Sequence, residues 1–208
     1  MIRAHGVSVS VLALVMALSG ATAVQAADKV GEVSRLIPDA TAIPAGEVTY
    51  RTLSVSDGVQ YGDTLSTGSG AKLLVDLRDG SELTLGEDTV VILDDLVIQE
   101  EQTSGVMTVM SGVFLLAGGE QTKHENMVIK TPIATIGIRG TSVWGGEING
   151  QFGVLLREGE VTVTTPRGSV VLDEPGEGTF ISHSGAAPTA PDMWQPDTRD
   201  AAIATVTF

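Results

Sequence analysis

Cysteine is absent from the 208 residues of the chain, and histidine is rare. Without cysteine there are no disulfide bonds, thiolate metal sites or cysteine nucleophiles, so a folded domain has to rely on its own core. Beyond the N-terminal segment the histidines are His124 and His183, each in a polar stretch, and no His-Glu-x-x-His motif occurs. We therefore predict no metal site and no cofactor.

Basic and aromatic residues are also scarce. The chain has 12 Lys and Arg against 26 Asp and Glu, which gives a formal net charge of −14 at pH 7. This balance opposes binding to nucleic acid and to anionic lipid surfaces, because both need cationic side chains to neutralise phosphate. Aromatic residues make up 4% of the chain and provide few stacking platforms for sugars.

Catalytic motifs are lacking as well. No Gly-x-Ser-x-Gly turn occurs, so a serine hydrolase is not supported. The acids of residues 94–101 lack the spaced loop that fixes a calcium ion. Glu158 and Glu160 would share a face if they lay on one regular strand, which leaves a polysaccharide-cleaving β-helix as an alternative. Acid pairs beside a glycine are common in turns, and we predict a protein that is not an enzyme.

An apolar run occurs at the N-terminus. Arg3 precedes a stretch of roughly 12 residues from Val7 to Leu18, and a small-x-small site ends at Ala26. These features are typical of a secretory signal peptide, and the stretch is shorter than the about 20 residues that span a bilayer. We predict cleavage after Ala26, with a retained anchor as the alternative. Loss of Arg3 changes the net charge from −14 to −15. No later run is long enough to predict a transmembrane helix.

Short β-rich segments fill most of the remaining chain. Apolar residues alternate or cluster over four to eight positions, with Gly, Asp and Ser between the clusters. Asp79-Gly80 and Asn149-Gly150 are candidates for tight turns, because both residue types tolerate positive φ. A Gly-Glu-x-Thr pattern recurs at unequal intervals. Its positions are 46–49, 86–89, 119–122, 159–162 and 176–179. We predict an all-β domain over residues 27–182, built as an irregular β-solenoid or a double-layered β-structure of short strands with Gly-rich turns.

The composition changes at His183. Residues 183–208 are rich in Pro, Ala and Ser, which is typical of a linker or an extended tail. The last residues alternate, with Ala204, Val206 and Phe208 on one side, so we predict a final strand folded back onto the domain; a free tail is the alternative. Trp194 in this tail is either an anchor packed on the domain or a free recognition residue, and we favour packing, because burial of a tryptophan offsets part of the entropy lost when the tail is ordered.

A single charge interrupts the apolar segment TPIATIGIRGTSVW, residues 131–144. If Arg139 is enclosed, its guanidinium needs a carboxylate or several carbonyls, because an unpaired buried charge is costly. We favour a structural role, in which Gly140 makes a tight bend and Arg139 ties the turn together. The alternative is that Arg139 faces a carboxylate on a peptide or a sugar. The candidate binding residues are Arg139, Thr141, Trp144 and Trp194.

This segment resembles the signature of the FecR domain, a β-rich module of the periplasm. The resemblance extends over roughly residues 30–182. It includes GDTLSTG at 62–68, DGSEL at 79–83, EGEV at 158–161 and PGEG at 175–178. The best-known members cross the inner membrane, control a sigma factor in the cytoplasm and respond to an outer-membrane receptor. The sequence predicts neither the cytoplasmic segment nor the membrane helix, so we expect a standalone exported form of the domain.

The resemblance and the composition together favour a binding protein. We expect a periplasmic protein-interaction module that takes part in envelope signalling or scaffolding, with a protein of the periplasm or envelope as partner. Exposed strand edges would offer backbone groups to a partner strand. The alternatives are a module that binds cell-envelope glycan and, after it, a polysaccharide-degrading enzyme.

Overall fold

A computed structural model describes residues 29–99, 102–118 and 123–208. The predicted signal peptide, residues 1–26, lies outside the described residues. Within these ranges the chain forms strands and one short helix. They are β1 (Lys29–Ile37), β2 (Ala40–Ile43), β3 (Arg51–Thr52), β4 (Gly58–Gln60), β5 (Thr64–Thr67), β6 (Lys72–Leu77), β7 (Glu82–Leu85), β8 (Val90–Gln99), β9 (Gln102–Ser111), β10 (Phe114–Ala117), β11 (Lys123–Lys130), β12 (Thr135–Ile148), β13 (Gln151–Thr165), β14 (Gly168–Leu172), β15 (Glu177–Ile181), β16 (Asp192–Met193) and α1 (Pro196–Ala204).

Local sequence explains the strands and their turns. In β6, Leu73, Val75 and Leu77 are buried while the residues between them are not, as alternation predicts. The tight turns predicted at Asp79-Gly80 and Asn149-Gly150 are confirmed. Gly80 has a φ of +82° between β6 and β7, and Asn149 and Gly150 have φ values of +54° and +74° between β12 and β13.

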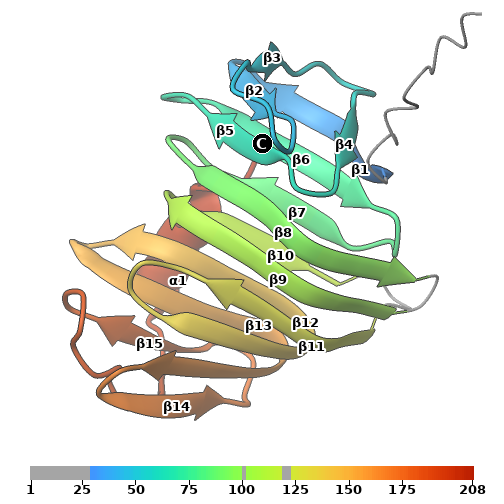
Figure 1. The fold of residues 1–208 in the computed structure, drawn as a ribbon. Helices are drawn as coiled ribbons and strands as arrows, with labels where there is room; N and C mark the ends of the chain where they lie inside the picture. The colour runs from blue at the N-terminus through green and yellow to red at the C-terminus, as the bar shows by residue number, and fades with distance from the viewer. Residues whose placement is uncertain (1–28, 100–101, 119–122) are drawn as a thin grey trace, which may run out of the picture.

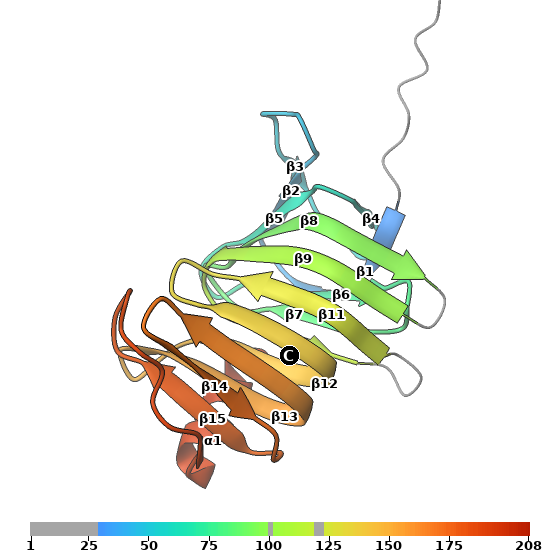
Figure 2. The same cartoon turned by 60° about the horizontal axis from the view of Figure 1, so that its bottom comes forward.

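The strands join into one curled sheet that forms a half-barrel (Figures 1 and 2). Its first arm contains β2, β5, β8, β9 and β11, and its second arm contains β10, β7, β6 and β1. The arms meet in β12, which pairs with β11 through residues 135–138 and with β10 through residues 142–145. β13 follows β12 along this course. Apolar side chains from both arms form one core on the inner face, including Leu65, Val91, Val75 and Leu83.

A glycine pair makes the corner between the arms. Ile136 and Ile138 face the core, and so does Val143. On a regular strand, residues an odd number apart face opposite sides, so the alternation of β12 shifts by one residue between Ile138 and Val143. This is a β-bulge, and it lies at Gly140, with a φ of +86°. Across the hairpin Gly159 has a φ of +87°, and a Cβ built on Gly140 would lie 3.7 Å from its Cα. The tight bend predicted at Gly140 is present.

The predicted fold class is correct only at the coarse level. The described chain is mostly β, but it forms a curled half-barrel and not a clear solenoid or double-layered structure. The Gly-Glu-x-Thr repeats differ in structure: 46–49 lies between β2 and β3, 86–89 between β7 and β8, 159–162 within β13, and 176–179 leads from a turn into β15. The pattern therefore marks no coil of a solenoid. The repeat at 119–122 lies outside the described residues.

The C-terminal segment corrects a second prediction. Residues 196–204 form helix α1, where the alternating pattern predicted a final strand. Pro196 is in the first turn of the helix and Asp197 follows, which are both favourable at a helix start. The alternation at the end of the chain comes largely from residues beyond the helix, where Val206 is buried. The segment packs on the outer face of the second arm.

Candidate functional site

The sequence segment that resembled the FecR signature lies at the corner of the sheet, and a groove opens beside it. The groove has a volume of about 380 Å³. It is lined by residues of β11, β12 and β13: Met127, Val128, Gly137, Ile138, Arg139, Glu160 and Thr162. Gly137 leaves its floor open, since a Cβ built there would meet only the Thr162 carbonyl, at 3.9 Å.

Arg139 is exposed on the outer face, so the predicted enclosure is wrong. Its neighbours at 136 and 138 face the core, and alternation turns the residue after Ile138 towards solvent. Arg139 lies opposite Glu160 in the ladder of β12 and β13. Among the described residues its guanidinium has no hydrogen bond and no ion pair within 4.0 Å. The planar fork of donors is therefore free at the edge of the groove.

Glu158 and Glu160 do not form the regular acid pair that a single strand would give. They lie on either side of Gly159, where the register of β13 shifts, and they pair with Ser142 and Arg139 respectively. The spacing expected for two residues on one face of a strand therefore does not apply to them. The described residues also contain no group of three His, Cys, Asp or Glu that could hold a metal ion.

The two tryptophans lie away from this groove, in a second apolar cluster under the C-terminal segment. Trp144 is 0% exposed and Trp194 is 6% exposed. Their rings meet edge to face with centroids 6.0 Å apart, and Trp194 stacks on Phe180 at 4.5 Å. Contact of a ligand with Trp144 would require the C-terminal segment to move. Thr141 belongs to β12, but its side chain is outside the described part of the structure.

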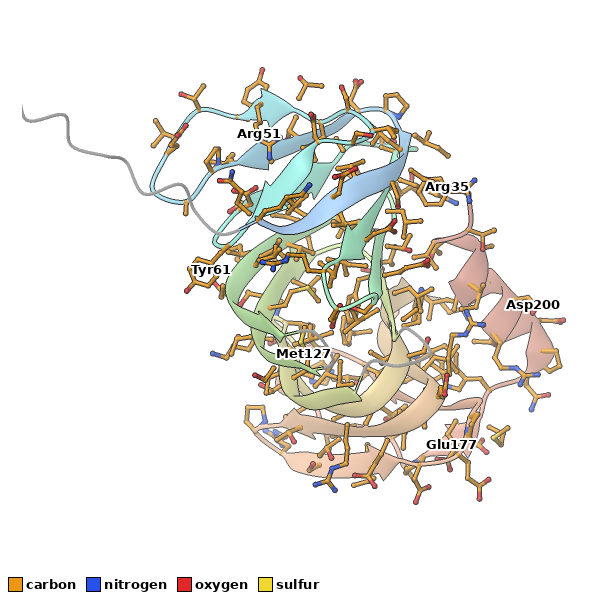
Figure 3. The ribbon with its side chains drawn as sticks, turned by 90° about the vertical axis from the view of Figure 1, so that its right-hand side faces the viewer. Arg35, Arg51, Tyr61, Met127, Glu177 and Asp200 are labelled. Carbon is orange, nitrogen blue, oxygen red and sulfur yellow. The ribbon has the colours of Figure 1, made fainter. Side chains whose placement is uncertain are left out.

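Polar contacts hold the C-terminal segment on the second arm. The Trp144 Nε1–H donates to Thr205 Oγ1 at 3.1 Å, and Lys72 Nζ donates to the carbonyls of Ala204, at 3.0 Å, and Thr207. The Arg35 guanidinium lies 4.5 Å from the centroid of the Phe208 ring. Figure 3 shows Arg35 beyond the helix at the upper right. The segment thus crosses the outer face from β15 to β1.

A third site, which sequence reasoning missed, surrounds Arg51 and Asp63 at the opposite end of the sheet (Figure 3). Arg51 Nη2 donates to the Gly58 carbonyl at 2.7 Å and to Asp63 Oδ2 at 3.4 Å. The Gln60 N–H donates to the same carboxylate at 3.0 Å. The Asp63 side chain is 1% exposed, and burial raises the pKa of its carboxyl in spite of these contacts. Asp63 belongs to the segment GDTLSTG at 62–68, which resembles the FecR domain, but the sequence did not single out this residue as a site.

The described residues form a mostly β domain with a groove on its outer face, and their one helix, α1, has nine residues and is too short to span a bilayer. The family described as FecR protein matches residues 63–170, more than half of the chain. The chain belongs to the FecR family. No curated protein matches it in sequence.

One solved structure supports the fold. A crystal structure at 2.50 Å of a "putative anti-sigma factor" from Parabacteroides distasonis ATCC 8503 is similar with a TM-score of 0.51 and 17% identity. The similarity covers 66% of this chain and 62% of that one, so the chain spans less than two thirds of that protein's length. A second structure with the same description, at 1.65 Å, has a TM-score of 0.49, 20% identity and coverage of 66% and 63%.

Proposed function

We propose that the chain is a non-enzymatic protein-interaction module of the periplasm that takes part in envelope signalling. In this proposal the groove at the sheet corner receives an extended segment of a partner protein, and Arg139 binds a carboxylate on that segment. The observation that carries the proposal is the exposed guanidinium of Arg139, which has no partner among the described residues and lies beside an open groove.

The chemistry of the groove suits a peptide acid. A guanidinium binds a carboxylate through two parallel hydrogen bonds, and this geometry selects a carboxylate more specifically than the ammonium group of a lysine does. Gly137 lets a partner backbone approach the strands closely, since no side chain covers it. Val128 and Thr162 line the groove on either side of Gly137 in the ladder and offer apolar contact.

Family membership and fold similarity support the signalling context. The chain belongs to the FecR family, and a protein described as a "putative anti-sigma factor" shares its fold over about two thirds of the chain. The acidic composition opposes nucleic acid as the ligand. The segment predicted as a signal peptide supports export, and a protein partner in the periplasm follows from that prediction.

The test is chemical cross-linking of the tagged protein in its own cells, followed by affinity purification and mass spectrometry. We expect one reproducible protein partner, lost in Arg139→Gln and reduced in Gly137→Val, which fills the floor of the groove. Arg167→Gln is the matched control, because it removes the same charge from an exposed residue that does not line the groove. The control should retain the partner.

Two results would overturn the proposal. One is a partner that binds Arg139→Gln as well as the wild type. The other is retention of the purified protein on envelope glycan with no protein partner, which would favour the glycan-binding alternative. The melting temperature of each variant shows whether it is folded.

A further inference from the structure

The loop of residues 44–50, between β2 and β3, carries the two most exposed large apolar side chains of the described residues. We propose that this loop is a docking element that inserts Val48 and Tyr50 into an apolar pocket with a basic rim on a protein partner. The inference rests on the proposed function in one respect, since both need a protein partner. It concerns a different surface, to which the sequence analysis assigned no binding residue.

The exposure of the loop is the first observation. Val48 is 95% exposed and Tyr50 is 66% exposed. No other large apolar side chain of the described residues is as exposed as these two; Val55, at 57%, comes next. Single exposed apolar residues need no explanation, but two such side chains, two residues apart in one projecting loop, are suited to insertion into a partner. Tyrosine is also frequent among residues that dominate binding energy.

The loop is held in place without covering these side chains. The Glu47 N–H donates to the Pro44 carbonyl at 3.0 Å, and Ala45 packs so closely on Gly62 that a Cβ there would lie 2.7 Å from the Ala45 Cβ. Arg51 anchors the end of the loop through Gly58 and Asp63. A loop that is already ordered loses less conformational entropy on binding. Figure 2 shows it extending beyond the sheet at the top of the view.

Charge selects the kind of partner. Glu47 belongs to the loop, and Asp57, with 40% of its side chain exposed, lies beside Arg51 at the base. The whole chain carries −14, so an anionic lipid surface and a second copy of the chain would both be repelled. A protein pocket that is apolar inside and bordered by Lys or Arg complements both the side chains and the charge.

The loop and the groove are separate surfaces. β3 is at one end of the strand order, while β12 and β13 form the corner between the two arms. Figure 1 shows β2 and β3 at the opposite end of the molecule from β13 and β14. Variants at one surface can therefore be compared with variants at the other.

The experiment is site-specific photocross-linking in the cells that make the protein. Benzoylphenylalanine replaces Val48, and in the matched control it replaces Val171, which is 46% exposed on β14. We expect position 48 to form an adduct with one protein, through a peptide that is apolar and flanked by Lys or Arg. The adduct should be absent from position 171 and fall at least tenfold in Tyr50→Ser.

Binding of the purified pair completes the test. Val48→Asp should weaken binding at least tenfold and leave the melting temperature unchanged, because the side chain is almost fully exposed. Raised salt should weaken binding as well. The proposal is wrong if position 48 forms no adduct, reacts only with lipid or with a second copy of the chain, gives the same adducts as position 171, or reacts with a partner that binds Val48→Asp normally.

The two proposals can fail separately. If Arg139→Gln abolishes binding of a partner while position 48 forms no adduct, the loop proposal is wrong and the proposed function stands. If position 48 forms the expected adduct and Arg139→Gln retains the partner, the loop is a binding surface and the groove is not.

Discussion

Single residues at the corner of the sheet have separable roles. Gly140 makes the bend through its backbone, and Arg139 directly before it is exposed on the outer face. The arginine is therefore not required to hold the bend. Composition and alternation allowed the glycine's role to be predicted, but not the side of the sheet on which the arginine lies. That side depends on which neighbours meet the core.

The exposure of Arg139 leads to a prediction for stability. Surface substitutions usually change stability little, so Arg139→Ala should shift the melting temperature by less than about 2 °C. Thermal unfolding monitored by circular dichroism measures the shift. A large decrease would mean that the guanidinium has a structural partner in solution.

Gly140 and Gly137 offer a matched pair on one strand. Gly140→Ala places a Cβ on a residue with a φ of +86° and should lower the free energy of unfolding by about 1–2 kcal/mol. At Gly137 an added Cβ has enough space, since its nearest neighbour would be 3.9 Å away, so Gly137→Ala should change the free energy of unfolding by less than about 0.5 kcal/mol. Chemical denaturation measures both values, and equal effects would contradict the role of the bulge.

Asp63 gives a pH dependence. Burial raises the pKa of this carboxyl in the folded protein above its ordinary value of 3.8. The folded state then binds the proton more tightly than the unfolded chain, so the stability contribution is full below pH 3.8 and is lost as pH rises through the raised pKa. Asp63→Asn removes this titration.

The expected outcome is a difference between wild type and Asp63→Asn that changes steadily with pH. The free energy of unfolding of the wild type, minus that of the variant, should decrease from about pH 3.5 to neutral pH. Urea denaturation across this range measures it. An increase would show that the contacts with Arg51 and Gln60 outweigh the effect of burial.

At the scale of elements, the strands were more predictable than the C-terminal segment. Alternation located strands such as β6 and β7, and Gly-containing turns located their ends. The helix was missed because its nine residues are few and the alternation of the last residues favoured a strand. Pro196 and Asp197 are typical of a helix start, but the Pro-rich composition around them favoured the prediction of a linker. The packing of Trp194 on the domain, which the sequence favoured, is confirmed by its burial, but the rings that it meets follow from tertiary packing.

The C-terminal segment should depend strongly on Trp194. The chain has two tryptophans, so Trp194→Ala leaves Trp144 as the single tryptophan fluorophore. We expect its emission to shift to longer wavelength, because loss of the buried anchor releases the cover of Trp144, while the far-UV circular dichroism of the sheet is kept. Met193→Ala, at a residue 45% exposed, is the control and should leave the emission unchanged. An unshifted emission in Trp194→Ala would mean that the segment is held by its other contacts.

At the scale of the whole molecule, the sheet is built from pairings between distant segments. β1 pairs with β6, β10 pairs with β12, and β9 pairs in parallel with β11. Local patterns predict that strands exist, but they do not specify partners so far apart in the chain. This is why the all-β class could be predicted and the half-barrel could not.

These distant pairings should make folding slow. Proteins dominated by non-local strand pairing fold in milliseconds to seconds, and not in microseconds. Stopped-flow refolding by dilution from urea, followed by circular dichroism, measures the rate. A complete refolding reaction within microseconds would contradict a sheet that has to close such long loops first.

The bent hairpin of β12 and β13 has a mechanical consequence. Both strands run through the two arms, and their continuity is interrupted at Gly140 and Gly159, where the backbone bends. A change in the angle between the two arms would require rotation of the backbone mainly at these two residues, which would then act as hinge residues. The groove lies directly beside these two glycines on the outer face, since Arg139 and Glu160 line it. A segment bound in the groove would restrict rotation at the two glycines, and it would thereby fix the angle between the two arms of the half-barrel.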